Sequence, residues 1–273
     1  MPTYEPFDWY ATPRHYDIVF DGETAIEARF IEAALDRYRT GPARASRRLL
    51  EPACGSCRLL ALLARRGWAM SGFDASGPML DFARRRLAGR RATPLAADLR
   101  HARFHDFPAA MWKAGRFGGA FCLVSSFQYV ASEAEAREHL RRMADALLPG
   151  GIYLLALHLT DYTRRRELRE RWVASRGGTE VVAAIRHGLP DRRRRAIPMR
   201  SRLTVTEGGS VRRFETNWEF RTFDRSEIRR LLASEPRFEH VATHDYWLEI
   251  DRPVPFDRDL HDCVLVLRRR GRG

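Results

Sequence analysis

The chain has 273 residues, of which 44% are hydrophobic, enough for one α/β domain with an insertion and a well-packed core. No apolar run approaches the roughly 18 residues that a membrane-spanning helix needs, and the acidic, aromatic start from Met1 to Tyr10 is unlike a secretory signal. We therefore expect a cytoplasmic protein with no membrane partner.

The charge of the chain is strongly basic. Forty-eight basic and 35 acidic residues give a net charge of +13, which by itself favours a nucleic-acid partner. However, Lys113 is the only lysine, and the arginines are scattered apart from short clusters such as Arg192–Arg195. A phosphate-binding surface has no reason to exclude lysine, because either side chain neutralises a phosphate. A nucleic-acid substrate is therefore an alternative that the sequence does not favour.

Strands and helices are expected to alternate over the first 160 residues. An irregular, aromatic lead-in precedes an amphipathic helix over Thr24–Tyr38. The elements expected next are strand Arg48–Glu51, helix Arg58–Arg66, strand Trp68–Phe73, helix Pro78–Ala88, strand Thr93–Ala97, strand Gly118–Ser125, a helix that begins after Ser132, and strand Ile152–Leu159. This order predicts a doubly wound α/β fold: a mostly parallel seven-stranded sheet with helices on both faces, and ligands at the carboxyl ends of its strands.

The pattern changes after Leu159. The charged segment Asp161–Trp172 is expected to be helical, and alternating residues around Gly208-Gly209 predict an antiparallel β-hairpin inserted after the fifth strand. The last elements expected are a helix over Ser226–Leu232 and an antiparallel strand pair over Phe238–Ile250 and His261–Leu267. We therefore divide the chain into a core with an N-terminal lid (1–159), an inserted cap (160–222), and a closing helix and strand pair (223–273).

The turn after the first strand is the most informative stretch, and it reads Glu51-Pro52-Ala53-Cys54-Gly55-Ser56-Cys57. Small residues let the backbone approach a ligand closely, and the helix that follows offers unpaired N–H groups. The dinucleotide fingerprint G-x-G-x-x-G is absent, which disfavours a nicotinamide-dependent dehydrogenase. The C-x-x-C spacing of Cys54 and Cys57 is typical of a redox pair or half a zinc site, but no second pair completes a metal centre, so no metal is expected.

Acidic residues end three successive expected strands. Glu51 ends the first strand, Asp74 the second, and Asp98 the third. An acid at the position of Asp74 can accept hydrogen bonds from both hydroxyls of a ribose, and Asp98 is placed to meet an adenine amino group. These acids at one edge of a sheet indicate a site for a ligand that contains a nucleoside.

In these features the chain resembles the class I S-adenosylmethionine-dependent methyltransferases. Glu51-x-x-x-Gly55-x-Cys57 is similar to their acid-x-Gly-x-Gly-x-Gly motif, with Ala53 and Cys57 at the outer glycine positions, and Asp74 and Asp98 match their ribose- and adenine-binding acids. Leu148-Pro149-Gly150-Gly151 matches the turn before their fifth strand, and Tyr16-Asp17 resembles a Tyr-Asp pair of many small-molecule methyltransferases.

The resemblance implies an S-adenosylmethionine-dependent methyltransferase (EC 2.1.1.-) with S-adenosylmethionine as its cofactor. The residues that it assigns to the cofactor are Tyr16, Glu51, Ala53, Cys54, Gly55, Cys57, Asp74, Ala75, Met79, Asp98, Leu99 and Ser125. Because Cys57 stands where a glycine normally lies against the methionine portion of the cofactor, weaker or displaced binding is one expectation.

The methyl acceptor is left open by the sequence, with a small molecule favoured. Ser125-Ser126-Phe127-Gln128-Tyr129 lacks the Asn/Asp-Pro-Pro-Tyr of enzymes that methylate planar amino groups. The catalytic candidates are His158 as a base and Tyr129 and Tyr16 as residues that orient the acceptor, while Trp218 could cap its pocket. The alternatives are a nucleic-acid methyltransferase that uses the arginine-rich surface and a non-catalytic S-adenosylmethionine-binding domain.

Overall fold

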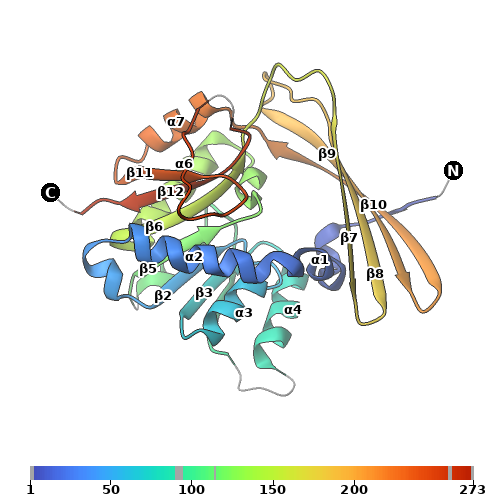
Figure 1. Cartoon of the computed structure of the whole chain (residues 1–273), viewed down its shortest axis with the longest axis horizontal. Coiled ribbons are helices and arrows are strands. Elements are labelled where there is room, and N and C mark those ends of the chain that lie inside the picture. Colours follow the sequence, from blue (N-terminus) through green and yellow to red (C-terminus); the bar gives the residue numbers. More distant parts are fainter. Residues whose placement is uncertain (1–2, 90–94, 114, 258–259, 272–273) are drawn as a thin grey trace.

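The computed structural model describes residues 3–89, 95–113, 115–257 and 260–271. Its larger sheet confirms the expected α/β architecture, with seven strands of which most are parallel (Figure 1). Strand β12 runs antiparallel to both β11 and β6, and the other strand pairs of this sheet in the described part of the chain are parallel. The strand order is β11 (Phe238–His244), β12 (Asp262–Arg269), β6 (Leu147–His158), β5 (Phe117–Cys122), β2 (Arg48–Pro52), β3 (Ala69–Asp74) and β4 (Ala97–His101).

Helices cover both faces of this sheet because neighbouring strand residues point into two separate apolar clusters. Leu49 and Leu154 pack with the helices of one face, whereas Leu50 and Leu155 pack with those of the other. The first face carries α2 (Thr24–Tyr38), α3 (Arg58–Arg65) and α4 (Gly77–Ala88), and the second carries α5 (Ala110–Lys113), α6 (Glu133–Ala146) and α7 (Arg225–Ala233). None of the helices in the described ranges combines the length and apolar character that crossing a membrane requires.

A second sheet, called the cap sheet below, projects from the side of the core (Figure 1). It is an antiparallel meander of β7 (Leu168–Arg176), β8 (Thr179–His187), β9 (Ala196–Glu207) and β10 (Ser210–Arg221), with β1 (Glu5–Pro6) parallel to β10. One face is apolar, and its residues Val181, Leu203 and Phe214 pack against α1 (Pro13–Phe20). Helix α1 therefore lies at the junction of the two sheets, as Figure 1 shows.

The cap sheet corrects one sequence-based expectation and extends another. Asp161–Trp172 is not a helix, because residues from Leu168 onward form β7 and pair with β8, a partner that a local pattern cannot reveal. The hairpin expected around Gly208-Gly209 is present as β9 and β10, which pair antiparallel, but it forms half of a four-stranded meander. At β7, tertiary pairing has overridden the local pattern.

Two further expectations concern the N-terminal half. The lead-in is not irregular throughout, because Pro13 opens α1 at a position where its missing N–H costs no helical hydrogen bond. The strand expected at Thr93–Ala97 falls partly outside the described residues, and the strand described here, β4, begins at Ala97 and continues to His101.

Buried His139 on α6 supplies a prediction about acid stability. Its Nδ1 lies 3.0 Å from the carbonyl oxygen of Phe104 and its Nε2 lies 2.9 Å from the hydroxyl of Tyr153, so the neutral ring is fully hydrogen-bonded. Burial lowers the pKa of His139 to about 3. Between roughly pH 6.5 and 3 the unfolded chain therefore binds a proton that the folded chain does not, and stability falls as the pH decreases.

We expect this histidine to remove about 2–3 kcal/mol of unfolding free energy between pH 6.5 and 4.5. Urea unfolding of the wild type and of His139→Gln at pH 6.5 and at pH 4.5 gives the change of unfolding free energy with pH for each protein. The difference between the two proteins measures the effect of His139. Exposed His261, replaced by Gln, is the control and should keep the wild-type slope. Parallel slopes for wild type and His139→Gln would contradict the assignment.

Candidate active site

A cavity of about 1640 Å³ lies between the carboxyl ends of the parallel strands, α1 and the cap sheet. Residues that follow β2, β3, β4 and β5 line its core side, and residues of β7, β8, β9 and β10 line its cap side. Ligand pockets for one small molecule typically have about 300–1000 Å³. The cavity therefore has room for two small ligands side by side.

The turn between β2 and α3 forms one end of the cavity and needs three left-handed residues. The φ angles are 53° at Ala53, 50° at Gly55 and 56° at Cys57. Glycine adopts this conformation freely, whereas Ala53 and Cys57 do so at a cost of roughly 1–2 kcal/mol each. The Cys57 side chain is fully buried in the apolar cluster beneath the turn, so its thiol does not obstruct the cavity.

Asp74, the last residue of β3, faces this turn. Its Oδ2 accepts a hydrogen bond of 2.8 Å from the Gly55 N–H, and its Oδ1 accepts one of 2.8 Å from the Ser76 N–H. Burial raises the pKa of Asp74, although these backbone donors oppose the shift. Each carboxylate oxygen keeps a further lone pair, so Asp74 can still accept two hydrogen bonds from a ligand.

The structure brings together only part of the residue set that the resemblance assigned to the cofactor. Tyr16, Ala53, Gly55, Asp74 and Ala75 line the cavity, and the Tyr16 ring lies above Gly55. The side chains that do not line it are those of Glu51, Cys54, Cys57, Met79, Asp98, Leu99 and Ser125. The cavity wall is therefore made by the backbone of the turn and by the end of β3.

Several of the side chains that do not line the cavity are buried close behind this wall. Burial raises the pKa of Glu51 well above its usual value, and its Oε2 has no hydrogen-bond partner among the described residues. A hydrogen bond with Cys57, together with burial, raises the pKa of Cys54, so this thiol stays protonated and is a poor metal ligand. Ser125 is buried and is hydrogen-bonded to the Tyr246 hydroxyl.

Asp98 is not at a strand end, which corrects the expectation from sequence. Strand β4 continues to His101, which is the residue that pairs with Asp74, whereas Asp98 pairs with Ser71 inside the sheet. The Asp98 carboxylate lies 2.7 Å from the Arg100 guanidinium. Residues 102–105, which follow β4, line the cavity instead.

Three tyrosine side chains, those of Tyr10, Tyr16 and Tyr129, line the cavity. The Tyr10 hydroxyl donates a 2.6 Å hydrogen bond to that of Tyr129, whose ring centroid lies 4.7 Å from that of Phe220 on β10. Burial raises the pKa of Tyr10, Tyr16 and Tyr129, so their hydroxyls remain protonated and can donate hydrogen bonds rather than accept protons as bases. Trp218 also lines the cavity, and its indole N–H has no partner among the described residues.

His158 ends β6 and lines the cavity together with an acid that the sequence analysis missed. Its Nδ1 lies 2.6 Å from Oδ1 of Asp262, the first residue of β12. Burial opposes ionisation of Asp262, but its hydrogen bond with His158 holds its pKa below the usual value. The two residues are 104 positions apart, and no local motif connects them.

A second histidine–carboxylate pair comes from the cap sheet. Nε2 of His187 on β8 lies 2.8 Å from Oε1 of Glu170 on β7. The His187 ring centroid lies 6.2 Å from that of His158. Sequence reasoning missed this pair because β7 was expected to be helical and β8 was not expected at all.

The lining of the cavity is acidic although the chain is basic. Its carboxylates are Asp8, Asp21, Glu23, Glu27, Asp74, Glu135, Glu170 and Asp262, and its arginines are Arg103, Arg171 and Arg176. Asp21 pairs with Arg176, and Glu27 pairs with Arg58 outside the lining. The remaining acids still outnumber the arginines, so the cavity suits a ligand that carries a cationic group.

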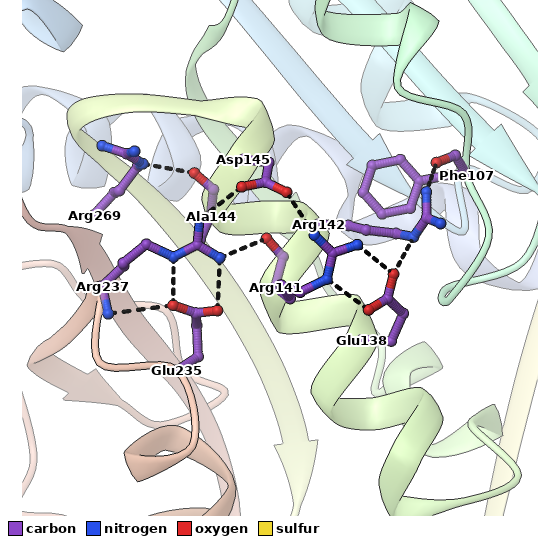
Figure 2. Close-up of polar contacts among 9 residues, drawn as sticks. All are labelled: Phe107, Glu138, Arg141, Arg142, Ala144, Asp145, Glu235, Arg237 and Arg269. Carbon is purple, nitrogen blue, oxygen red and sulfur yellow. Dashed lines mark hydrogen bonds and ion pairs between the residues drawn. The ribbon is translucent and has the colours of Figure 1, made fainter.

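Many arginines serve as structural links between elements. Figure 2 shows Arg237 bound to Glu235 and to Asp145 of α6, each at 2.6 Å. In the cluster Arg192–Arg195, Arg194 pairs with Glu219 at 2.9 Å and Arg195 pairs with Glu227 at 2.8 Å. These four acid–arginine pairs therefore hold their arginines within the fold.

Asp17, the second residue of the Tyr-Asp pair, is fully buried and joins four elements. It accepts hydrogen bonds from Ser56 Oγ at 2.7 Å, from Arg176 of β7 at 2.6 Å, and from Arg86 of α4. Burial opposes ionisation, but Arg86, Ser56 and Arg176 together lower the pKa of Asp17. Asp17 therefore fixes the cap sheet and α1 against the turn that forms the cavity wall.

Comparisons with known proteins agree with this geometry. A family model described as a methyltransferase domain matches residues 49–151. A Streptomyces fradiae protein named dTDP-3-amino-3,6-dideoxy-alpha-D-glucopyranose N,N-dimethyltransferase is 33% identical over 143 residues, which are 51% of this chain and 50% of that protein. The chain thus spans about half the length of this curated relative.

Solved structures match nearly the whole chain. DesVI of Streptomyces venezuelae has a TM-score of 0.74 at 20% identity over 97% of this chain and 99% of its own. S-adenosylmethionine-bound CalS10, an amino pentose methyltransferase from Micromonospora echinaspora, has a TM-score of 0.68 at 21% identity over 98% of this chain and 100% of its own. Residues 49–151 are therefore similar to a methyltransferase domain, and the chain has the fold of the class I S-adenosylmethionine-dependent methyltransferases.

Proposed function

We propose that this chain is an S-adenosylmethionine-dependent methyltransferase that acts on an amino group of a small molecule. The observation that carries the proposal is the single cavity that joins the Gly55–Asp74 wall to an acid-rich region around His158 and Glu170. One end suits a nucleoside, and the other suits a cationic acceptor.

The residues at the first end fit S-adenosylmethionine. Asp74 would accept hydrogen bonds from the ribose hydroxyls, and Gly55 would allow close approach beneath the Tyr16 ring. Cys57 does not cap α3 with a side-chain hydrogen bond, and the positive end of the helix dipole would attract the carboxylate of the methionine portion. When bound, the cofactor supplies an electrophilic methyl group on a sulfonium.

The second end supports an amine as acceptor. Glu170 and Asp262 place negative charge there, which attracts an ammonium group. The Streptomyces fradiae relative is named for dimethylation of an amino sugar nucleotide, and CalS10 is named as an amino pentose methyltransferase. We infer that residues 160–222 form an acceptor-side cap on a core (1–159) that the final segment (223–273) completes.

Positioning is the main contribution of the cavity residues to methyl transfer. Holding the acceptor nitrogen in line with the methyl group converts a bimolecular encounter into an intramolecular step and lowers the barrier by several kcal/mol. Tyr129 and Tyr16, with protonated hydroxyls, would orient the acceptor by donating hydrogen bonds, and Trp218 would do so through its indole N–H.

Calorimetry and a transfer assay test the proposal together. We expect S-adenosylmethionine and S-adenosylhomocysteine to bind, and NADH not to bind. We expect mass spectrometry to detect methylation of dTDP-3-amino-3,6-dideoxyglucose or of a member of a panel of amino sugars, but not of matched sugars with a hydroxyl in place of the amine. Failure of the folded protein to bind either adenosyl compound would refute the proposed cofactor.

A further inference from the structure

We propose that His158, oriented by Asp262, is the base that takes a proton from the ammonium group of the acceptor. The proposal rests on the proposed amine methylation and adds a catalytic residue to it. Amines are largely protonated at neutral pH, and a protonated nitrogen has no lone pair with which to attack a methyl group. An enzyme that binds the ammonium form therefore needs a group that accepts its proton.

The hydrogen bond to Asp262 leaves His158 ready to accept a proton. A carboxylate is an acceptor only, so at 2.6 Å the Nδ1 of His158 is the protonated nitrogen and donates to Asp262. The lone pair of the neutral ring is then on Nε2. Within the described ranges no residue is hydrogen-bonded to Nε2, and the side chain lines the cavity.

The backbone makes this arrangement rigid. His158 and Asp262 are directly paired residues on the antiparallel strands β6 and β12, so their side chains leave the sheet side by side. The His158 N–H donates to Gln128 Oε1 at 3.1 Å, and the Gln128 amide donates to the Arg221 carbonyl oxygen at 3.2 Å. Gln128 is 2% exposed, so it holds the end of β6 against the cap sheet through a buried contact.

The groups that face His158 favour proton transfer to it. Glu170 and His187 approach from the cap sheet, and the Tyr246 ring lies 5.5 Å from the His158 ring. Exposed His261 precedes Asp262 in the chain but does not line the cavity. Glu170 and Asp262 attract the ammonium form of the acceptor. Asp262 also stabilises the imidazolium ion that forms at His158, because its carboxylate is already hydrogen-bonded to the ring.

The step balances with no further reactant. One N–H bond of the ammonium group breaks, its proton binds Nε2 of His158, and the electron pair stays on nitrogen. That lone pair then forms the N–C bond to the methyl group while the C–S bond breaks and its electron pair remains on sulfur. The proton on His158 passes to solvent through the open cavity before the next turnover.

Variants of the pair test the assignment in the acceptor assay at a series of pH values. At neutral pH we expect kcat/KM for the amine to fall about 100-fold or more in His158→Gln, and by a smaller factor in Asp262→Asn. The affinity for S-adenosylmethionine, measured by calorimetry, should stay within about twofold of the wild-type value. A twofold change corresponds to less than about 0.5 kcal/mol. Adjacent His261→Gln is the control and should match the wild type.

The pH profile separates a base from a packing residue. We expect the rate of His158→Gln to rise with pH until the acceptor itself is deprotonated, because a neutral amine no longer needs a base. A purely structural role would leave a deficit at every pH. A wild-type profile in His158→Gln would overturn the assignment while leaving methyl transfer intact, whereas a wild type that binds the cofactor but methylates no amine would overturn both proposals.

Discussion

Asp74→Ala is expected to weaken S-adenosylmethionine binding by at least about 100-fold, because each hydrogen bond to a charged group contributes about 1.5–3 kcal/mol and the ribose would lose two. The variant also loses the acceptors for the Gly55 and Ser76 N–H groups, so the turn beneath the cofactor loosens. Calorimetric titration measures the affinity, and circular dichroism shows that the variant is folded.

The matched control is Asp98→Ala, an acid on the neighbouring strand. Its side chain is paired with Arg100 and does not line the cavity, so we expect an affinity within about twofold of the wild type, a difference below 0.5 kcal/mol. An equal loss in both variants would show that Asp98 reaches the cofactor after all. Asp98 would then have the adenine-binding role that the family resemblance implies.

The acid dependence of binding follows from the same residue. Burial raises the pKa of Asp74, so its carboxylate becomes protonated at a less acidic pH than an ordinary aspartate does. A protonated carboxyl accepts hydrogen bonds less strongly than a carboxylate does. The affinity for S-adenosylmethionine is therefore expected to fall on acidification as the pH passes through this raised pKa.

Glu27→Ala is expected to destabilise the fold by about 3–5 kcal/mol, because it leaves the charge of Arg58 buried without its partner. Glu27 of α2 and Arg58 at the start of α3 are 6% and 8% exposed and form a bidentate ion pair. A hydrogen bond of 3.1 Å joins Arg58 to Thr24 as well. Urea unfolding measures the loss.

Two further variants give this prediction its controls. Asp81 and Arg84 of α4 form a pair that is 62% and 53% exposed, and Asp81→Ala should change stability by no more than about 0.5 kcal/mol. Replacing Glu27 and Arg58 together by methionine should recover most of the loss, because neither charge then remains buried. A loss for Glu27→Ala as small as that for Asp81→Ala would contradict the assignment.

Local signals in the sequence were sufficient for most of the core. The helix over Thr24–Tyr38 matches α2 to the residue, and the helix expected at Pro78–Ala88 differs from α4 only in beginning at Gly77. These elements are set by interactions among residues a few positions apart. The turn around Gly55 could be predicted for the same reason, because its left-handed backbone conformation favours glycine and other small residues.

The sequence by itself therefore determined the α/β order, the Gly55 turn and the acid at the end of β3, all of which depend on neighbours along the chain. Only the tertiary structure decided that Asp98 lies inside β4, that the cap is a meander, and that Asp262 meets His158 across 104 positions. The physical reason is that strand register and the identity of a strand's partner are set by contacts between distant segments, which leave no periodic trace within either segment.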